Sequence, residues 1–138
     1  MRLEHLNLVV RDLEKTLAFY QVAFPHWRVR TSGKAEWYGV ERNWLHFGDE
    51  YQYLTFNDDG VEDNRDLSGH QVGLAHFAFE TSDVEAIIKR MSNAGFPPRL
   101  IGRENPFRKN AYFIDPDGYE VEFVEYSSDL PEERNNNE

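Results

Sequence analysis

The hydrophobic and polar positions at the start of the chain follow first a period of two and then a helical period. From Leu3 to Val10 the residues alternate, with one strongly apolar side, which predicts a half-buried strand. Asp12 can cap a helix and Pro25 ends it, because the apolar residues between them recur at helical spacing. These residues are Leu13, Leu17, Tyr20 and Phe24.

Between residues 27 and 57 the pattern predicts short antiparallel strands that are rich in aromatic residues. A Ser32-Gly33 break and a polar turn at residues 41–43 separate them. The predicted strands are residues 27–31, 36–40, 44–47 and 51–57. Residues 58–71 are polar and acidic and have no periodicity, which is typical of a linker.

The strand and helix pattern then starts again. Gly73 to Glu80 alternates as a strand, Ser82 and Glu85 form a capping-box sequence, and Gly95 closes the helix that follows. The stripe of this second helix consists of Val84, Ile87, Ile88 and Met91. Further strands are predicted at residues 99–102, 111–114 and 119–126, the last of them after a tight turn at 115–118.

The two halves of the chain keep a constant offset of 71 positions over the strand, the cap and the helix. The matched pairs are His5 and His76, Asp12 and Asp83, Leu13 and Val84, and Tyr20 and Met91. This offset indicates an internal repeat of two βαβββ modules. Continued to the module ends, the comparison places Tyr53 opposite Glu122 with an offset of 69.

The repeat predicts an α+β protein in which two paired βαβββ modules form a curved, partly open mixed sheet around a concave site. We expect the modules at residues 1–57 and 72–126, with residues 58–71 as the linker. Residues 127–138 are expected to be a disordered acidic tail.

A candidate metal site follows from the equivalent places of His5 and His76, each on the strand face opposite the helix. If a pseudo-twofold axis relates the modules, these faces converge on a shared concave surface, where Glu122 also falls. Two imidazoles and one carboxylate are the ligand set of an octahedral facial site for Fe(II), Mn(II), Ni(II) or Zn(II). Such a site chelates a substrate through two neighbouring oxygen atoms.

Composition limits the partners of the protein. The formal net charge of −10 argues against nucleic acid and would suit a cationic ligand. The chain has no cysteine, so a metal would be held by His, Asp or Glu. The sequence shows neither a signal peptide nor an apolar run of membrane length, which predicts a soluble, cytoplasmic protein without a membrane partner.

Three segments resemble the vicinal oxygen chelate superfamily, which includes glyoxalase I, extradiol dioxygenases, fosfomycin resistance thiol transferases and bleomycin resistance proteins. They are residues 5–13 (HLNLVVRDL) with 18–20 (AFY), residues 76–79 (HFAF) and residues 115–122 (DPDGYEVE). The resemblance runs from His5 to Glu125 and implies that His5, His76 and Glu122 are metal ligands. It also implies a homodimer, in some members with a site shared between chains.

The resemblance is incomplete at one position. Glyoxalase I has a fourth ligand, usually a carboxylate or amide oxygen, at the place that corresponds to Tyr53. A neutral phenol is a poor ligand because its ordinary pKa is near 10. The three-ligand pattern is more similar to the thiol transferases and dioxygenases, and Tyr112 stands where the fosfomycin enzymes have a tyrosine near the substrate.

Two functions remain open from the sequence. The first is a metal-dependent, glyoxalase-like enzyme of lyase or isomerase, thiol transferase or dioxygenase type. It would act on a small oxygenated substrate, with Tyr53 or Tyr112 donating a hydrogen bond or a proton. The second is a metal-free protein of the bleomycin resistance type that sequesters a cationic aromatic compound. The complete ligand triad favours the enzyme, because a sequestering protein does not need it.

Several aromatic residues could either line a pocket for a flat or apolar substrate or pack the sheet. They are Trp37, Tyr38, Trp44, Phe47 and Phe56.

Overall fold

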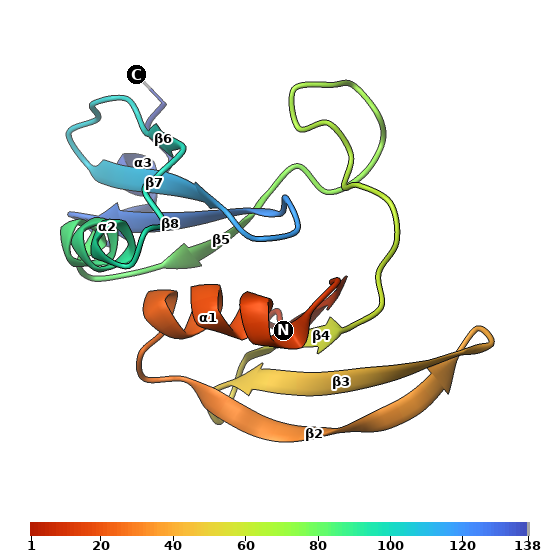
Figure 1. Cartoon of the computed structure of the whole chain (residues 1–138). Coiled ribbons are helices and arrows are strands. Elements are labelled where there is room, and N and C mark those ends of the chain that lie inside the picture. Colours follow the sequence, from red (N-terminus) through yellow and green to blue (C-terminus); the bar gives the residue numbers. More distant parts are fainter. Residues whose placement is uncertain (138) are drawn as a thin grey trace. The chain divides into compact units, whose positions relative to one another are not determined.

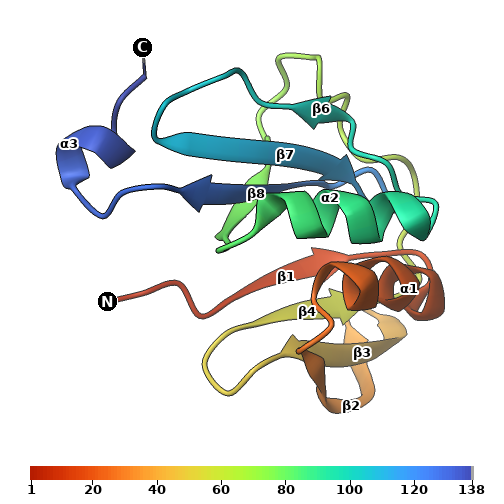
Figure 2. The same cartoon turned by 90° about the vertical axis from the view of Figure 1, so that its left-hand side faces the viewer.

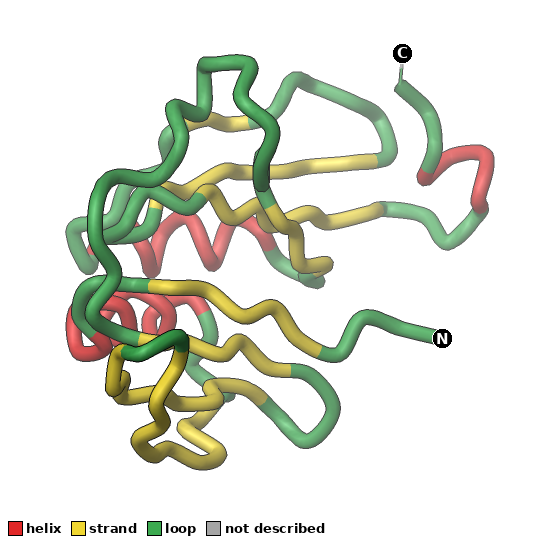
Figure 3. The backbone as a smooth tube through the Cα atoms, turned by 90° about the vertical axis from the view of Figure 1, so that its right-hand side faces the viewer, coloured by secondary structure: helices red, strands yellow, loops and turns green. Residues whose placement is uncertain are grey.

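The computed structural model describes residues 1–137. The chain divides into two compact units, Met1–Asp63 and Asn64–Glu138. The boundary between them lies inside the segment that the sequence marks as a linker, which the tube in Figure 3 shows as a long loop. Within residues 1–137 no helix is both long and apolar enough to cross a membrane.

The first unit is a βαβββ module (Figure 1). Its elements are β1 (His5–Val9), α1 (Leu13–Ala23), β2 (Arg28–Trp37), β3 (Val40–Gly48) and β4 (Tyr53–Asn57). They form a sheet of order β1-β4-β3-β2, in which β1 pairs with β4 in parallel and the other pairs are antiparallel. The first and last strands of the module are therefore neighbours.

The second unit repeats this topology. Its elements are β5 (Phe77–Glu80), α2 (Val84–Asn93), β6 (Leu100–Ile101), β7 (Arg108–Ile114), β8 (Glu120–Tyr126) and α3 (Pro131–Arg134). The sheet order is β5-β8-β7-β6, again with a parallel pair formed by the first and last strands. The predicted α+β fold of two βαβββ modules is confirmed.

Each unit has its own core, formed by the apolar stripe of its helix and one face of its sheet. The largest fully buried side chains of the first unit are Phe19, Tyr20, Phe47, Leu54 and Phe56. Those of the second unit are Val84, Met91, Phe113, Val121 and Phe123. Each of the large aliphatic and Phe side chains contributes about 1.5–3 kcal/mol by leaving water.

The β2–β3 hairpin differs from the sequence prediction. The expected break at Ser32-Gly33 lies inside β2, and the expected turn at residues 41–43 lies inside β3. The chain turns instead at Tyr38-Gly39, where φ is 51° and 81°. Two consecutive residues with positive φ make the type I′ turn that suits a two-residue hairpin. Gly33 lies against the indole of Trp44, where a Cβ would come within 3.0 Å, so its small size serves packing.

Both helices begin at an aspartate. The Asp12 carboxylate accepts from the Lys15 N–H at 3.0 Å, and the Asp83 carboxylate accepts from the Ala86 N–H at 2.9 Å. The capping residue of α2 is thus Asp83, which the repeat matches to the cap Asp12, and not Ser82 of the capping-box sequence. At the other end Gly95 has φ of 89°, and the Phe96 N–H reaches the Met91 carbonyl at 2.8 Å, which closes the helix as predicted.

The segment before β5 is held by an arginine rather than by strand pairing. The guanidinium of Arg65 donates to the carbonyls of Gly69, Gln71 and Leu74 at 2.9, 3.0 and 3.4 Å. Of these acceptors, Leu74 belongs to the predicted strand Gly73–Glu80, and β5 begins at Phe77 instead of Gly73. His76 consequently lies directly before the strand.

The expected disorder of residues 127–138 does not extend to residues 131–134, which form α3. Arg134 of this helix binds both carboxylate oxygens of Glu80, at 3.0 and 2.8 Å, and its guanidinium lies 3.9 Å from the centre of the Tyr126 ring. The acidic composition of residues 127–138 did not indicate that Arg134 would bind Glu80 and Tyr126 on the sheet.

We predict that Asp83→Ala lowers the free energy of unfolding by about 1 kcal/mol, because it removes an N-cap hydrogen bond. Ser82→Ala is the matched control and should change it by less than about 0.5 kcal/mol. Urea denaturation followed by circular dichroism measures both. Equal effects of the two substitutions would contradict the structural assignment of the cap.

A second prediction concerns Glu80, whose pKa is lowered chiefly by its hydrogen bonds from Arg134. A carboxylate with a lowered folded-state pKa stabilises the fold above its ordinary pKa, and this contribution is lost as the pH falls. Glu80→Gln should therefore lower the urea midpoint slightly at pH 7 and have no effect near pH 3. Glu132→Gln is the control and should have no effect at either pH; a Glu80→Gln effect that persisted at pH 3 would contradict the ionic origin.

Candidate functional site

The face of the second sheet opposite α2 carries an unusual set of polar side chains. Helix α2 lies along β8 (Figure 2). Val121 and Phe123 of β8 are core residues, 0% and 1% exposed, and the residues that alternate with them turn the other way. Glu120 and Glu122 are on this opposite face, yet they are only 8% and 9% exposed. Burying a carboxylate costs free energy unless hydrogen-bond donors satisfy it. The partners of Glu120 and Glu122 therefore determine the chemistry of this face.

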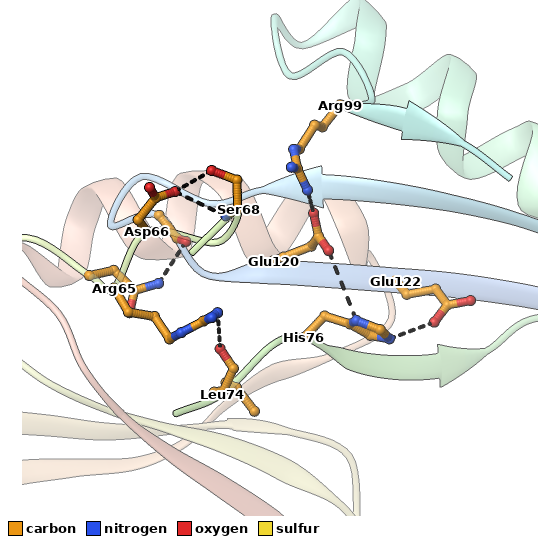
Figure 4. Close-up of polar contacts among 10 residues, drawn as sticks. Arg65, Asp66, Ser68, Leu74, His76, Arg99, Glu120 and Glu122 are labelled. Carbon is orange, nitrogen blue, oxygen red and sulfur yellow. Dashed lines mark hydrogen bonds and ion pairs between the residues drawn. The ribbon is translucent and has the colours of Figure 1, made fainter. Parts of the chain in front are cut away.

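His76 lies between these two carboxylates (Figure 4). Its Nε2 is 3.1 Å from Oε2 of Glu122, and its Nδ1 is 3.9 Å from Oε1 of Glu120. Two ligand atoms that each bind an ion at about 2.1 Å and at right angles are about 3.0 Å apart. The separation of His76 and Glu122 therefore fits neighbouring positions on one metal ion.

Tyr112 and Asn110 of β7 complete this face. Nδ2 of Asn110 donates to Oε1 of Glu122 at 2.8 Å and to Oη of Tyr112 at 3.0 Å. The Tyr112 ring meets the His76 ring edge-on with centres 5.5 Å apart. Burial and then the charge of Glu122 raise the pKa of Tyr112, so the phenol keeps its proton at neutral pH.

Arg99, which directly precedes the edge strand β6, binds Glu120. One of its oxygens, Oε2, accepts from the guanidinium of Arg99, and the other faces His76. Sequence reasoning assigned no role to Glu120 and did not identify Asn110. The alternation of β8 was a signal for Glu120, whereas nothing local marks Asn110, because its partner is on another strand.

The equivalent face of the first sheet carries a row of stacked rings. The His5 and Tyr53 rings stack with centres 4.7 Å apart, and Tyr53 and His46 stack at 4.6 Å. The guanidinium of Arg30 lies 4.4 Å from the centre of the Tyr53 ring. Burial, Arg30 and His5 lower the pKa of His46. The sequence did not identify His46 or Arg30 as part of this row.

Glu4 binds both His5 and Tyr53. Its Oε1 is 2.9 Å from Nδ1 of His5 and accepts from the Tyr53 hydroxyl at 3.2 Å. Burial and the hydrogen bond to Glu4 raise the pKa of Tyr53. The contact at Nδ1 leaves Nε2 of His5 as the nitrogen that can bind a metal ion.

The strand register corrects one part of the repeat. Leu6 pairs with Leu54, while Phe77, which is 71 positions after Leu6, pairs with Val121. The offset of the last strands is therefore 67 instead of 69. Tyr53 stands at the place of Glu120, and Thr55 stands at the place of Glu122.

The predicted ligands fall in both units. His76 and Glu122 are together in the second unit, and His5 is in the first with Glu4 as its neighbour. Among residues 1–137 no three His, Asp or Glu side chains are grouped closely enough to hold a metal ion.

The predicted aromatic pocket is not formed as a set. Phe47 and Phe56 are fully buried core residues, and Trp37 and Tyr38 are 37% and 92% exposed near the tip of the β2–β3 hairpin. An open pocket of about 600 Å³ lies in the second unit between α2, β6 and the loop before β7. Asn110 lines it, but neither His76 nor Glu122 does.

Comparison with known proteins agrees with this fold. The family model of the Glyoxalase/Bleomycin resistance protein/Dioxygenase superfamily matches residues 2–123. Two solved structures are similar over nearly their whole length: the glyoxylase/bleomycin resistance protein/dioxygenase domain from Frankia sp. EAN1pec and a glyoxalase family protein from Enterococcus faecalis. The first has a TM-score of 0.73 and 21% identity and covers 91% of this chain and 98% of its own. The second has a TM-score of 0.72 and 20% identity and covers 89% and 96%.

A mutant of the genomically encoded fosfomycin resistance protein FosX from Listeria monocytogenes, complexed with Mn(II) and 1S,2S-dihydroxypropylphosphonic acid, is also similar. Its TM-score is 0.68 at 21% identity, with 96% of both chains covered. At these identities the solved structures support the fold alone. The family model covers most of the chain, and the chain belongs to the Glyoxalase/Bleomycin resistance protein/Dioxygenase superfamily.

The contact between Glu4 and His5 gives a testable prediction. In the metal-free protein at pH 8, we expect the His5 imidazole to carry its proton at Nδ1, because Glu4 accepts it there. Long-range ¹H–¹⁵N NMR correlations distinguish the two tautomers. Glu4→Ala should shift His5 toward the Nε2–H form, whereas Glu50→Ala should not. An unchanged His5 tautomer in Glu4→Ala would contradict the role of Glu4 as the acceptor at Nδ1.

Proposed function

We propose that the protein is a metal-dependent vicinal oxygen chelate enzyme that acts on a small substrate with two neighbouring oxygen atoms. His5, His76 and Glu122 would hold a divalent ion, Fe, Mn, Ni or Zn. The observation that supports this most directly is the 3.1 Å separation of His76 Nε2 and Glu122 Oε2 on a face where a carboxylate is otherwise costly.

The donor set fits such an ion chemically. Imidazole and carboxylate suit borderline and hard divalent metals, and three protein ligands leave positions for substrate. When bound, the ion would supply Lewis-acid stabilisation of negative charge that develops on the substrate oxygens. His5 would complete the set, either from the same chain or from a partner in a homodimer.

Tyr112 is the residue we assign as hydrogen-bond or proton donor to the substrate. It retains its proton because burial and Glu122 raise its pKa, and its oxygen already accepts from Asn110. A hydrogen bond between its hydroxyl and Glu122 is a further cause of the raised pKa. Tyr53, the other candidate donor, already donates to Glu4 and lies between His5 and His46. Its role would be to hold the His5 ring.

The reaction type within the superfamily remains open to lyase or isomerase, thiol transferase and dioxygenase chemistry. The net charge of −10 does not favour nucleic acid as a partner, and a cytoplasmic location is part of the proposal. The similarity to FosX makes Mn(II) the first ion to test.

The test is the metal content per chain, by elemental analysis, of protein purified without chelator and then incubated with Fe(II), Mn(II), Ni(II) or Zn(II). We expect near one equivalent for the wild type. His5→Ala, His76→Ala and Glu122→Ala should each reduce affinity by more than the 10–100-fold that loss of an outer partner costs.

His70→Ala is the matched control, because His70 is an exposed histidine of the second unit, and it should retain the metal. A wild type that stays empty with all four ions would refute the enzyme proposal. Titration with aromatic cations would then test the sequestering function of the bleomycin resistance type.

A further inference from the structure

The two carboxylate oxygens of Glu122 have different partners. Oε2 lies 3.1 Å from Nε2 of His76, and Oε1 accepts a hydrogen bond from Nδ2 of Asn110 at 2.8 Å. The side chain is only 12% exposed, so water does not readily replace the amide as a donor. One oxygen therefore faces the candidate metal position, and the other is tied to the sheet.

Both N–H groups of the Asn110 side-chain amide donate hydrogen bonds. Its Nδ2 also donates to Oη of Tyr112 at 3.0 Å, so both of its hydrogens have acceptors. The orientation of the amide follows from chemistry, because a carboxylate only accepts and the carbonyl end of Asn110 would repel it. β7 and β8 pair Asn110 with Val124, so the side chain reaches diagonally along the sheet to Glu122.

Gly102 provides the space for this amide. Its N–H donates to the backbone carbonyl of Asn110 at 2.9 Å, and a Cβ at Gly102 would lie 1.6 Å from Oδ1 of Asn110. No side chain can therefore occupy position 102 while Asn110 keeps its contact with Glu122. The clash is with the end of a side chain, so a substitution would displace the amide and leave the backbone in place.

We propose that Asn110 is a positioning residue that restricts Glu122 to binding a metal ion through one oxygen, and that Gly102 is required for this. The inference rests on the proposed function. Carboxylates bind metal ions through either one or both oxygens. An octahedral ion with two imidazoles and a one-oxygen carboxylate keeps three open positions, two for neighbouring substrate oxygens and one more. If both oxygens of Glu122 bound the ion, the second oxygen would occupy that third position.

The experiment counts the water molecules on Mn(II), which is the probe. Full-length wild type, Asn110→Leu and Gly102→Ala are saturated with Mn(II), with free ion measured by electron paramagnetic resonance. Water-proton relaxation then gives the number of exchangeable waters on the bound ion. Leu has the same branching and number of side-chain heavy atoms as Asn but no donor, and Gly102→Ala moves Asn110 without removing it. Asn93→Leu, an exposed position at the end of α2, is the matched control.

We expect about one water fewer on Mn(II) in Asn110→Leu and Gly102→Ala than in the wild type, and no change in Asn93→Leu. Circular dichroism confirms that each variant is folded. Unchanged water counts in both variants, with Mn(II) bound normally, would overturn this inference alone. Folded variants that bind no Mn(II) at all would also overturn it, since Asn110 would then control binding rather than its mode. A wild type that binds no Mn(II) or other ion would overturn the proposed function and this inference with it.

Discussion

The parallel pairing of the first and last strands in each unit is the constraint on which the site depends. A parallel pair needs a crossover connection, and here the helix and two further strands lie between the paired strands. This topology brings His5 beside Tyr53 in the first sheet and places His76, directly before β5, beside the carboxylates of β8. Residues more than forty positions apart in the sequence thereby share one sheet face.

A second feature of the site is the burial of Glu120 and Glu122. Apolar residues at these positions would pack the sheet without a desolvation cost, so two carboxylates do not serve stability. Each is instead supplied with partners, Arg99 for one and Asn110 for the other, and His76 faces both. The arrangement keeps negative charge in a fixed place, which is the property a cation site requires.

The two units use one topology for different surfaces. In the first, the face opposite the helix holds stacked rings and Arg30, with Glu4 at the edge. In the second it holds carboxylates, an amide and a phenol. Because strand pairing uses the backbone and core packing uses only the inward-facing side chains, the outward-facing residues are free to differ. The repeat is therefore clear in the cores, and on the outer faces it is kept by His5 and His76, while most of the residues around them differ.

The sequence by itself determined the two modules, because strand alternation, helical spacing and the offset of 71 depend on burial, which acts locally along each element. It also identified His5, His76 and Glu122 as candidates from their places in that repeat. It misplaced the hairpin turn and the register of the last strands. These depend on backbone φ and on hydrogen bonds between distant segments, which composition does not record. Only the tertiary structure brought Asn110 to Glu122, Arg99 to Glu120 and Arg134 to Glu80, since each contact joins residues on different elements through the packing of the whole unit.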